Sequence, residues 1–162
     1  MAHKDVVQYT IVKSDASDAE TLAGVINAAF GLEQFFVHGD RISPEGIRRL
    51  IAGGGTFFAL KSGGETIATV YTEPRGSEKG YIGMLAVTPG IQGRSIGSRL
   101  MKHAEDHLAR EGATTIEITV VDLRTELFPF YEKRGYRRVG VDVFPRAAKR
   151  PCQLIVMTKA LT

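Results

Sequence analysis

The pattern of apolar and polar residues predicts seven strands and four helices. The strand-like segments are rich in β-branched and aromatic residues; they are Val6–Lys13, Thr56–Lys61, Thr66–Thr72, Tyr81–Val87, Thr114–Val121, Tyr136–Phe144 and Gln153–Thr158. The helix-like segments place apolar residues three and four positions apart; they run from Asp15 to Gly31, from Ser43 to Gly53, from Gly93 to Glu111 and from Leu123 to Arg134. The stretch Leu32–Ile42 shows neither period, so we expect an irregular loop there.

The order of these segments, β-α-α-β-β-β-α-β-α-β-β, indicates an α/β (α+β) fold. The segments from Tyr81 to Val121 form a strand–helix–strand unit, whose strands should be parallel and joined by a right-handed crossover. Glycines between Ser62 and Glu65 suit a hairpin turn. We therefore expect a single domain over residues 1–162, with a central mixed twisted sheet of about seven strands flanked by four helices.

Composition narrows the class of protein without naming a function. The 162 residues are 43% apolar and 24% charged, no run of 18 apolar residues occurs, and the first residues lack the apolar segment of a signal peptide. The single cysteine, Cys152, excludes an internal disulfide and suits a reducing compartment, so we expect a cytoplasmic protein without a membrane partner. The net charge of +3 is too small, without an aromatic-basic module or recognition helix, to predict a nucleic-acid partner.

The loop over residues 88–98 carries the first candidate chemistry, because a strand ends there and a glycine-bearing turn opens a long helix. Gly93 and Gly97 let the backbone approach a ligand closely. The first amides of the helix lack internal partners and lie at the positive end of its dipole, which suits a phosphate. Gln92 and Arg94 can add donors. The loop is neither a P-loop nor a dinucleotide fingerprint, and a tight turn without a ligand stays open as an alternative.

Two further patterns frame this loop. The strand end Leu85-Ala86-Val87-Thr88-Pro89 leads into Gln92-Gly93-Arg94-Ser95-Ile96-Gly97, and the next helix ends in Phe130-Tyr131-Glu132-Lys133-Arg134-Gly135-Tyr136. Together they resemble the GNAT superfamily of acetyl-coenzyme A-dependent N-acetyltransferases, whose motifs read Leu-x-Val-x-Pro, Arg/Gln-x-x-Gly-x-Gly/Ala and Tyr-x-Lys-x-Gly-Phe. The element order also matches the fold of that superfamily. Serine stands at position 95 where the family has glycine, which we expect to alter cofactor binding slightly.

The resemblance implies acetyl-coenzyme A as a co-substrate, with no metal. In the family, a bulge splays the strand Tyr81–Val87 from its parallel neighbour, and backbone amides near Leu85 and Ala86 polarise the acetyl carbonyl. The backbone of Val87 would pair with the pantetheine arm, and amides from Gln92 to Ser98 would hold the pyrophosphate. The implied cofactor contacts are Leu85, Ala86, Val87, Gln92, Gly93, Arg94, Ser95, Ile96, Gly97, Ser98, Arg124 and Tyr131.

Three residues are catalytic candidates. Tyr131 lies where the family places the general acid that protonates the departing thiolate, although it could instead be a core aromatic residue beside Phe128 and Phe130. The incoming amine must lose a proton, and a carboxylate is the usual recipient. Glu73 and Asp122 each end a predicted strand and could face the cleft, although either could be a surface carboxylate.

The acceptor site is expected to use Phe35, His38 and Phe128. The first two lie in the loop after the first helix, a region that borders the acceptor site in the superfamily. Arg124, Phe128 and Tyr131 follow i, i+4, i+7 spacing and would share a face of one helix. Arg124 stands where the family often has asparagine; it could hold an acidic group of the substrate or a phosphate of the cofactor, or remain solvated. His103 and His107 could bind zinc, but no third ligand is evident, so we interpret them as flanking a core stripe.

These observations predict an acyltransferase that moves acetyl from acetyl-coenzyme A to a primary amine by direct attack in a ternary complex. A small-molecule acceptor is favoured, and homodimers are common in the superfamily. A protein or peptide amine as acceptor, or a non-catalytic acyl-coenzyme A sensor, are the alternatives.

Overall fold

The computed structural model describes residues 8–91 and 95–162, and it confirms the predicted fold. A seven-stranded mixed sheet is accompanied by four α-helices in the predicted order. The strands are β1 (Tyr9–Lys13), β2 (Thr56–Ser62), β3 (Glu65–Pro74), β4 (Lys79–Val87), β5 (Thr115–Val121), β6 (Arg137–Val143) and β7 (Gln153–Ala160). The helices are α1 (Ala19–Ala29), α2 (Pro44–Ala52), α3 (Ile96–Arg110) and α4 (Leu127–Glu132), with short 3₁₀ turns η1 (Ala16–Asp18) and η2 (Phe30–Phe35).

Local sequence explains where the helices begin. The Ser43 side chain accepts a hydrogen bond of 3.0 Å from the amide of Gly46, and Pro44 occupies the first position of α2, where its missing N–H costs nothing. Pro129 likewise lies in the first turn of α4. That helix is shorter than predicted, because residues 122–126 form turns ahead of it. The segment predicted as a loop after α1 instead opens with η2.

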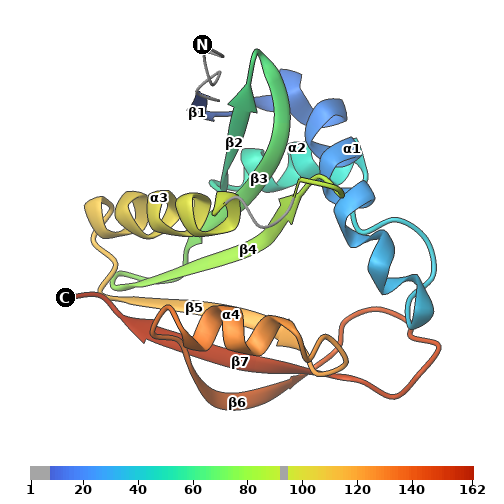
Figure 1. The fold of residues 1–162 in the computed structure, drawn as a ribbon. Coiled ribbons are helices and arrows are strands. Elements are labelled where there is room, and N and C mark those ends of the chain that lie inside the picture. The colour runs from blue at the N-terminus through green and yellow to red at the C-terminus, as the bar shows by residue number, and fades with distance from the viewer. Residues whose placement is uncertain (1–7, 92–94) are drawn as a thin grey trace, which may run out of the picture.

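The strand order in the sheet is β1-β2-β3-β4-β5-β7-β6, and β4 with β5 is its parallel pair. That pair is short: only three residue pairs join it, the last being Tyr81 with Glu117. By contrast, β5 and β7 pair along seven residues. The two strands therefore part in the middle of the sheet, and Figure 1 shows β4 diverging from β5 beyond this point.

An irregularity in β4 accompanies the separation. The register of β3 against β4 shifts between Thr69 and Tyr71, and Met84 has a φ of 48°, in the left-handed region that residues other than glycine rarely adopt. An extra residue in one strand bends it and re-aims its backbone groups. The bulge and the splayed strand that the family resemblance implied are both present.

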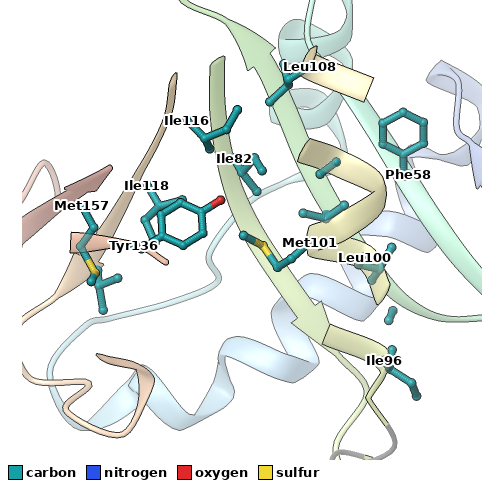
Figure 2. Packing of buried hydrophobic residues seen from close by; sticks show 14 of the residues in the cluster. Phe58, Ile82, Ile96, Leu100, Met101, Leu108, Ile116, Ile118, Tyr136 and Met157 are labelled. Carbon is teal, nitrogen blue, oxygen red and sulfur yellow. The ribbon is translucent and has the colours of Figure 1, made fainter. Parts of the chain in front are cut away.

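The helices cover the two faces of the sheet. One buried cluster joins α1 and α2 to Phe57, Ala59 and Tyr71. The other joins α3 and α4 to side chains from the opposite face, and Figure 2 shows its members from α3, β4, β5 and β7 meeting around Met101 and Ile82. Neighbouring residues Phe57 and Phe58 belong to different clusters, as the alternation of a strand requires.

A third contact closes one end of the molecule. The segment after η2 meets the connection between β6 and β7 through a β-bridge of Val37 with Ala148, and the Lys149 amide donates to the Phe36 carbonyl at 2.7 Å. Phe36, Val37 and Val121 form the small buried cluster beneath these connections. No helix within residues 8–91 and 95–162 is long and apolar enough to cross a membrane.

Candidate active site

A cavity of about 820 Å³ lies where β4 and β5 separate. It is lined by the second half of β4, the end of β5, the first turn of α3, the start of α4, the end of α1 with η2, and the connection between β6 and β7. Its volume is in the usual range for small-molecule sites. A gap between parallel strands, with helix starts at its side, can admit an extended ligand against the strand backbone.

The first turn of α3 forms one end of the cavity. Ser95, Ile96, Gly97 and Ser98 all line it. The first amides of a helix have no partner inside it, so they can donate to an anion. The predicted contacts Gln92, Gly93 and Arg94 lie outside the described residues.

Ser95 has an unusual backbone. Its φ of 59° and ψ of 19° put it in the left-handed region at the N-cap of α3, and its side chain makes no capping hydrogen bond. Glycine adopts this conformation without steric cost, which explains why the family motif has glycine here.

Gly97 has a different reason to be glycine. A Cβ atom at Gly97 would lie 3.2 Å from the Phe130 ring, tighter than most real contacts, and 3.7 Å from the Leu85 side chain. The missing side chain therefore lets α3 pack closely against α4 beside the cavity.

Arg134 adds a cation that the sequence reasoning did not single out. Its guanidinium lies 3.6 Å from the centroid of the Phe130 ring, donates to the Phe130 carbonyl at 2.6 Å, and contacts the Ser98 hydroxyl. It lines the cavity beside the first turn of α3, where a phosphate group would benefit from a positive charge. Its position inside the second family motif was the signal that could have identified it.

The predicted backbone contacts on β4 lie along the cavity in part. Leu85 and Val87 line it. Ala86 is buried in the cluster with α1, and its backbone pairs with Thr69 of β3. The roles of all three toward a cofactor stay predictions.

Tyr131 lines the cavity, and its hydroxyl makes no hydrogen bond with any described residue. The ring packs edge-on against Phe130 at 5.0 Å and Tyr136 at 5.9 Å, so it is part of the packed structure, and its role as general acid stays a prediction. Burial raises the pKa of Tyr131 to about 12. The phenol is therefore protonated at neutral pH, as a proton donor must be.

Neither predicted carboxylate is among the residues lining the cavity. Glu73 accepts hydrogen bonds from Tyr71 at 2.5 Å and Arg75 at 2.8 Å. Asp122 accepts from the Gln153 amide at 3.1 Å, which joins the end of β5 to the start of β7. The expectation that they face the cleft is not supported, because each carboxylate is engaged by its own surroundings.

Glu33 is the buried carboxylate that does line the cavity, and the sequence reasoning missed it. It lies in η2 with 7% of its surface exposed. Burial raises its pKa, although the nearby Arg124 acts in the opposite direction. No periodicity marks residues 32–42, so only the resemblance, which places the acceptor site in this region, could have pointed to Glu33.

Arg124 lines the cavity but is already paired. Its Nη1 donates to Glu33 at 2.8 Å and its Nε to Glu126 at 2.6 Å, and 11% of its side chain is exposed. The predicted shared helical face is wrong, because Arg124 lies in the turns before α4. The solvated alternative is also wrong, since the guanidinium is buried against two carboxylates.

The predicted acceptor contacts do not line the cavity. Phe128 is 5% exposed and packs in the core beneath Arg138, because α4 starts only at Leu127 and turns this ring inward. Phe35 is 44% exposed and stacks on Phe36. His38 is exposed, and its carbonyl, not its ring, accepts from Arg146 at 3.2 Å. Phe128 as a substrate contact is therefore corrected to a core residue.

His103 and His107 pack edge-on against Phe58, at 4.6 and 5.0 Å between ring centroids. Both flank the core stripe of α3, as expected. Within the described part of the chain, no group of three or more potential ligands is arranged to hold a metal ion.

The sequence of this chain is similar to that of known acetyltransferases. The sequence profile of the acetyltransferase (GNAT) family matches residues 17–136, which include both motifs. A curated relative, mycothiol acetyltransferase of Gordonia bronchialis, is 28% identical over 152 aligned residues, covering 86% of this chain and 46% of the relative. The chain thus spans about half the length of that relative.

Solved structures share the fold. PaiA N-acetyltransferase from Thermoplasma acidophilum, in complex with coenzyme A, superposes with a TM-score of 0.77 at 18% identity, over 95% of this chain and 99% of that one. The ribosomal-protein-S18-alanine N-acetyltransferase from Escherichia coli gives 0.75 at 20% identity, over 96% and 95%. Sequence identities this low establish the fold alone, whereas the family profile, which matches most of the chain, establishes family membership. The chain belongs to the GNAT family of acetyltransferases, enzymes that use acetyl-coenzyme A.

Proposed function

We propose that this enzyme transfers the acetyl group of acetyl-coenzyme A to the primary amine of a small molecule, by direct attack in a ternary complex. The observation that carries the proposal is one cavity lined by the start of α3, by Tyr131 and by the buried carboxylate of Glu33. The helix start suits a phosphate, the phenol can protonate a thiolate, and the carboxylate can accept a proton from an amine.

The cofactor half of the site fits coenzyme A in its chemistry. The amides of Ile96, Gly97 and Ser98, with the guanidinium of Arg134, offer donors and positive charge to a pyrophosphate. The backbone of β4 past Tyr81, where pairing with β5 has ended, can accept an extended amide-containing arm. Acetyl-coenzyme A would supply the thioester that is cleaved.

The reaction needs two proton movements. The amine nitrogen attacks the acetyl carbonyl carbon, the carbon–sulfur bond breaks, and the sulfur leaves as thiolate. Tyr131 donates a proton to that sulfur, and Glu33 accepts the proton lost by the nitrogen, directly or through water. We propose Glu33 for this role instead of Glu73 or Asp122, because it lines the cavity and its raised pKa makes it a better base.

A small acceptor is supported by the volume of the cavity, about 820 Å³, which is in the usual range for small-molecule sites. The Gordonia bronchialis relative is also named for a small molecule, mycothiol.

The test is release of free thiol from acetyl-coenzyme A with a panel of small amines and of peptides. Turnover with small amines supports the proposal, and turnover with peptides alone overturns the choice of acceptor. Saturable binding of acetyl-coenzyme A without turnover on the whole panel would instead identify a sensor.

A homodimer is a separate part of the proposal. Edge strand β6 exposes Val139, Val141 and Val143 to 60, 60 and 81%. Exposed apolar edges of this kind pair readily with another chain. Light scattering after gel filtration tests it, with Val141→Lys expected to shift a dimer to monomer; a monomeric wild type at high concentration overturns it.

A further inference from the structure

Two arginines at the acceptor end of the cavity have no acidic partner. Arg41, after η2, and Arg146, between β6 and β7, both line the cavity. Arg41 makes no hydrogen bond or ion pair with any described residue, and its guanidinium carbon lies 5.9 Å from the centroid of the Phe30 ring. Both side chains are half-buried.

The other described arginines that line the cavity either form ion pairs or lie elsewhere in it. Arg75 binds Glu73 and Glu117 at 2.8 and 2.9 Å and stacks on the Tyr81 ring at 3.8 Å. Arg124 binds Glu33 and Glu126. Arg134 lies at the opposite end, beside α3. Thus, among the described residues that line the cavity, Arg41 and Arg146 are the arginines without an ion pair where the acceptor would enter.

The position of Arg146 is fixed by the fold. Its Nη2 donates to the carbonyls of His38 at 3.2 Å and Asp40 at 2.9 Å. Its Nε and Nη1 have no acceptor among the described residues, so they remain available. Figure 1 shows the connection after α1 and the one between β6 and β7 meeting at the end of the molecule away from the body of α3.

Neither nearby acid makes a hydrogen bond or ion pair with these two arginines. Glu33 is bonded to Arg124, and Asp142, the other carboxylate lining the cavity, is exposed and accepts from the Val143 amide at 2.8 Å. Burial lowers the pKa of Arg41 and the charge of Arg146 acts in the same direction, while Tyr81 and Glu33 act in the opposite direction. An anion between the two guanidinium groups would relieve both the desolvation and the repulsion.

We propose that the acetyl acceptor is an acidic amine, one whose carboxylate or phosphonate binds between Arg41 and Arg146 while its amino group lies toward Glu33. This inference rests on the proposed function, since it names the substrate class of the same site. Arginine binds such groups through two parallel N–H donors, so it selects planar or tetrahedral anions over neutral groups of similar size.

The test uses acceptors matched except for the anion. Amino acids are compared with their methyl esters, and aminoalkyl phosphonates with the corresponding amino alcohols, by thiol release from acetyl-coenzyme A. We expect kcat/KM to be about 10- to 100-fold higher for the acidic member of each pair, the range that one charge-assisted hydrogen-bonded contact provides.

Variants assign the preference to the arginines. Arg41→Gln should remove the preference by raising KM for the acid, while KM for acetyl-coenzyme A stays unchanged. Arg49→Gln on the exposed face of α2 removes the same charge away from the cavity and should behave as wild type. Arg146→Gln should act like Arg41→Gln, but it also frees the carbonyls of His38 and Asp40, so Arg41 is the primary site.

The outcomes separate the two proposals. Equal turnover of acidic and neutral amines overturns the acidic-acceptor inference and leaves the acetyltransferase proposal standing. A higher KM for acetyl-coenzyme A in Arg41→Gln, with the acid preference intact, would assign Arg41 to cofactor phosphates and also overturn it. If no amine is acetylated, the proposed function itself is contradicted.

Discussion

The Tyr136 hydroxyl donates a hydrogen bond of 2.8 Å to the Glu105 carboxylate, although 31 residues separate them in the chain. The other oxygen of Glu105 accepts from Lys159 at 2.9 Å. Glu105 is 7% exposed, so this network satisfies a charge inside the core between α3 and the far half of the sheet. Tyr136 is the last aromatic of the second family motif, and its role here is structural.

Tyr136→Phe should therefore destabilise the fold. One carboxylate oxygen of Glu105 would lose its donor, which costs about 1–3 kcal/mol for a buried group. Urea denaturation measures the change, with Tyr9→Phe as the control, because the Tyr9 hydroxyl makes no hydrogen bond with described residues. Equal stability of the two variants would show that the bond contributes nothing.

Tyr131→Phe should lower kcat by about 100-fold, the lower range of general acid catalysis, with little change in KM for acetyl-coenzyme A. The ring keeps its packing against Phe130 and Tyr136, so only the hydroxyl is tested. Steady-state kinetics with saturating amine gives the answer, and unchanged kcat would remove the assigned role.

Glu33→Gln should reduce kcat/KM for the amine by about 100-fold or more. Glu33 has its pKa raised by burial, so the wild-type rate should fall on the acid side as this carboxylate is protonated, and the variant should lose that part of the profile. Glu73→Gln and Asp122→Asn are the comparison variants. A larger loss in either one would return the role of base to the residue first predicted from sequence.

Ser95→Gly should stabilise the protein by about 0.5–1 kcal/mol, because the left-handed conformation costs a non-glycine residue about 1–2 kcal/mol and glycine loses part of that gain in chain entropy. Ser95→Ala keeps the strain and removes only the hydroxyl, so it should not stabilise. Thermal unfolding distinguishes them; a destabilised glycine variant would mean that the serine hydroxyl holds the turn.

His103 and His107 should make stability fall as the pH drops from about 7 toward 5.5. Burial against Phe58 lowers the pKa of both rings, so the unfolded chain, with an ordinary histidine pKa of about 6.5, binds more protons than the folded one in this window. The His103→Gln/His107→Gln double variant should show a flatter dependence of the unfolding free energy on pH. Parallel curves for the two proteins would contradict this assignment.

The sequence predicted the sheet, the helices and the turn that opens α3, because these depend on local periodicity and on short motifs. It failed where contacts join distant segments. Glu33 and Arg124 pair across 91 residues, and neither position shows from spacing that the other lies beside it. Phe128 was misplaced because the direction of a helical side chain depends on where the helix begins, and Pro129 with the preceding turns sets that start at Leu127.

The arginines of the acceptor end illustrate the same limit. Arg41 lies in a segment without periodicity, and Arg146 lies in a connection whose course is set by bonds to His38 and Asp40. The two arginines come to line the same cavity because the connection after η2 and the connection between β6 and β7 meet in the fold. The net charge of +3 does not show which cations share the cavity.

The parting of β4 and β5 also has a mechanical consequence. A sheet resists opening because neighbouring strands are hydrogen-bonded along their length. Here β4 and β5, two interior strands, pair at three residue positions. A ligand with an extended arm along β4 would supply the hydrogen bonds that β5 does not make there. Binding of this ligand and the stability of the sheet are then coupled, since a ligand that binds only the folded state stabilises it. The supply of the acyl donor would thus set how firmly the two halves of the sheet are held together.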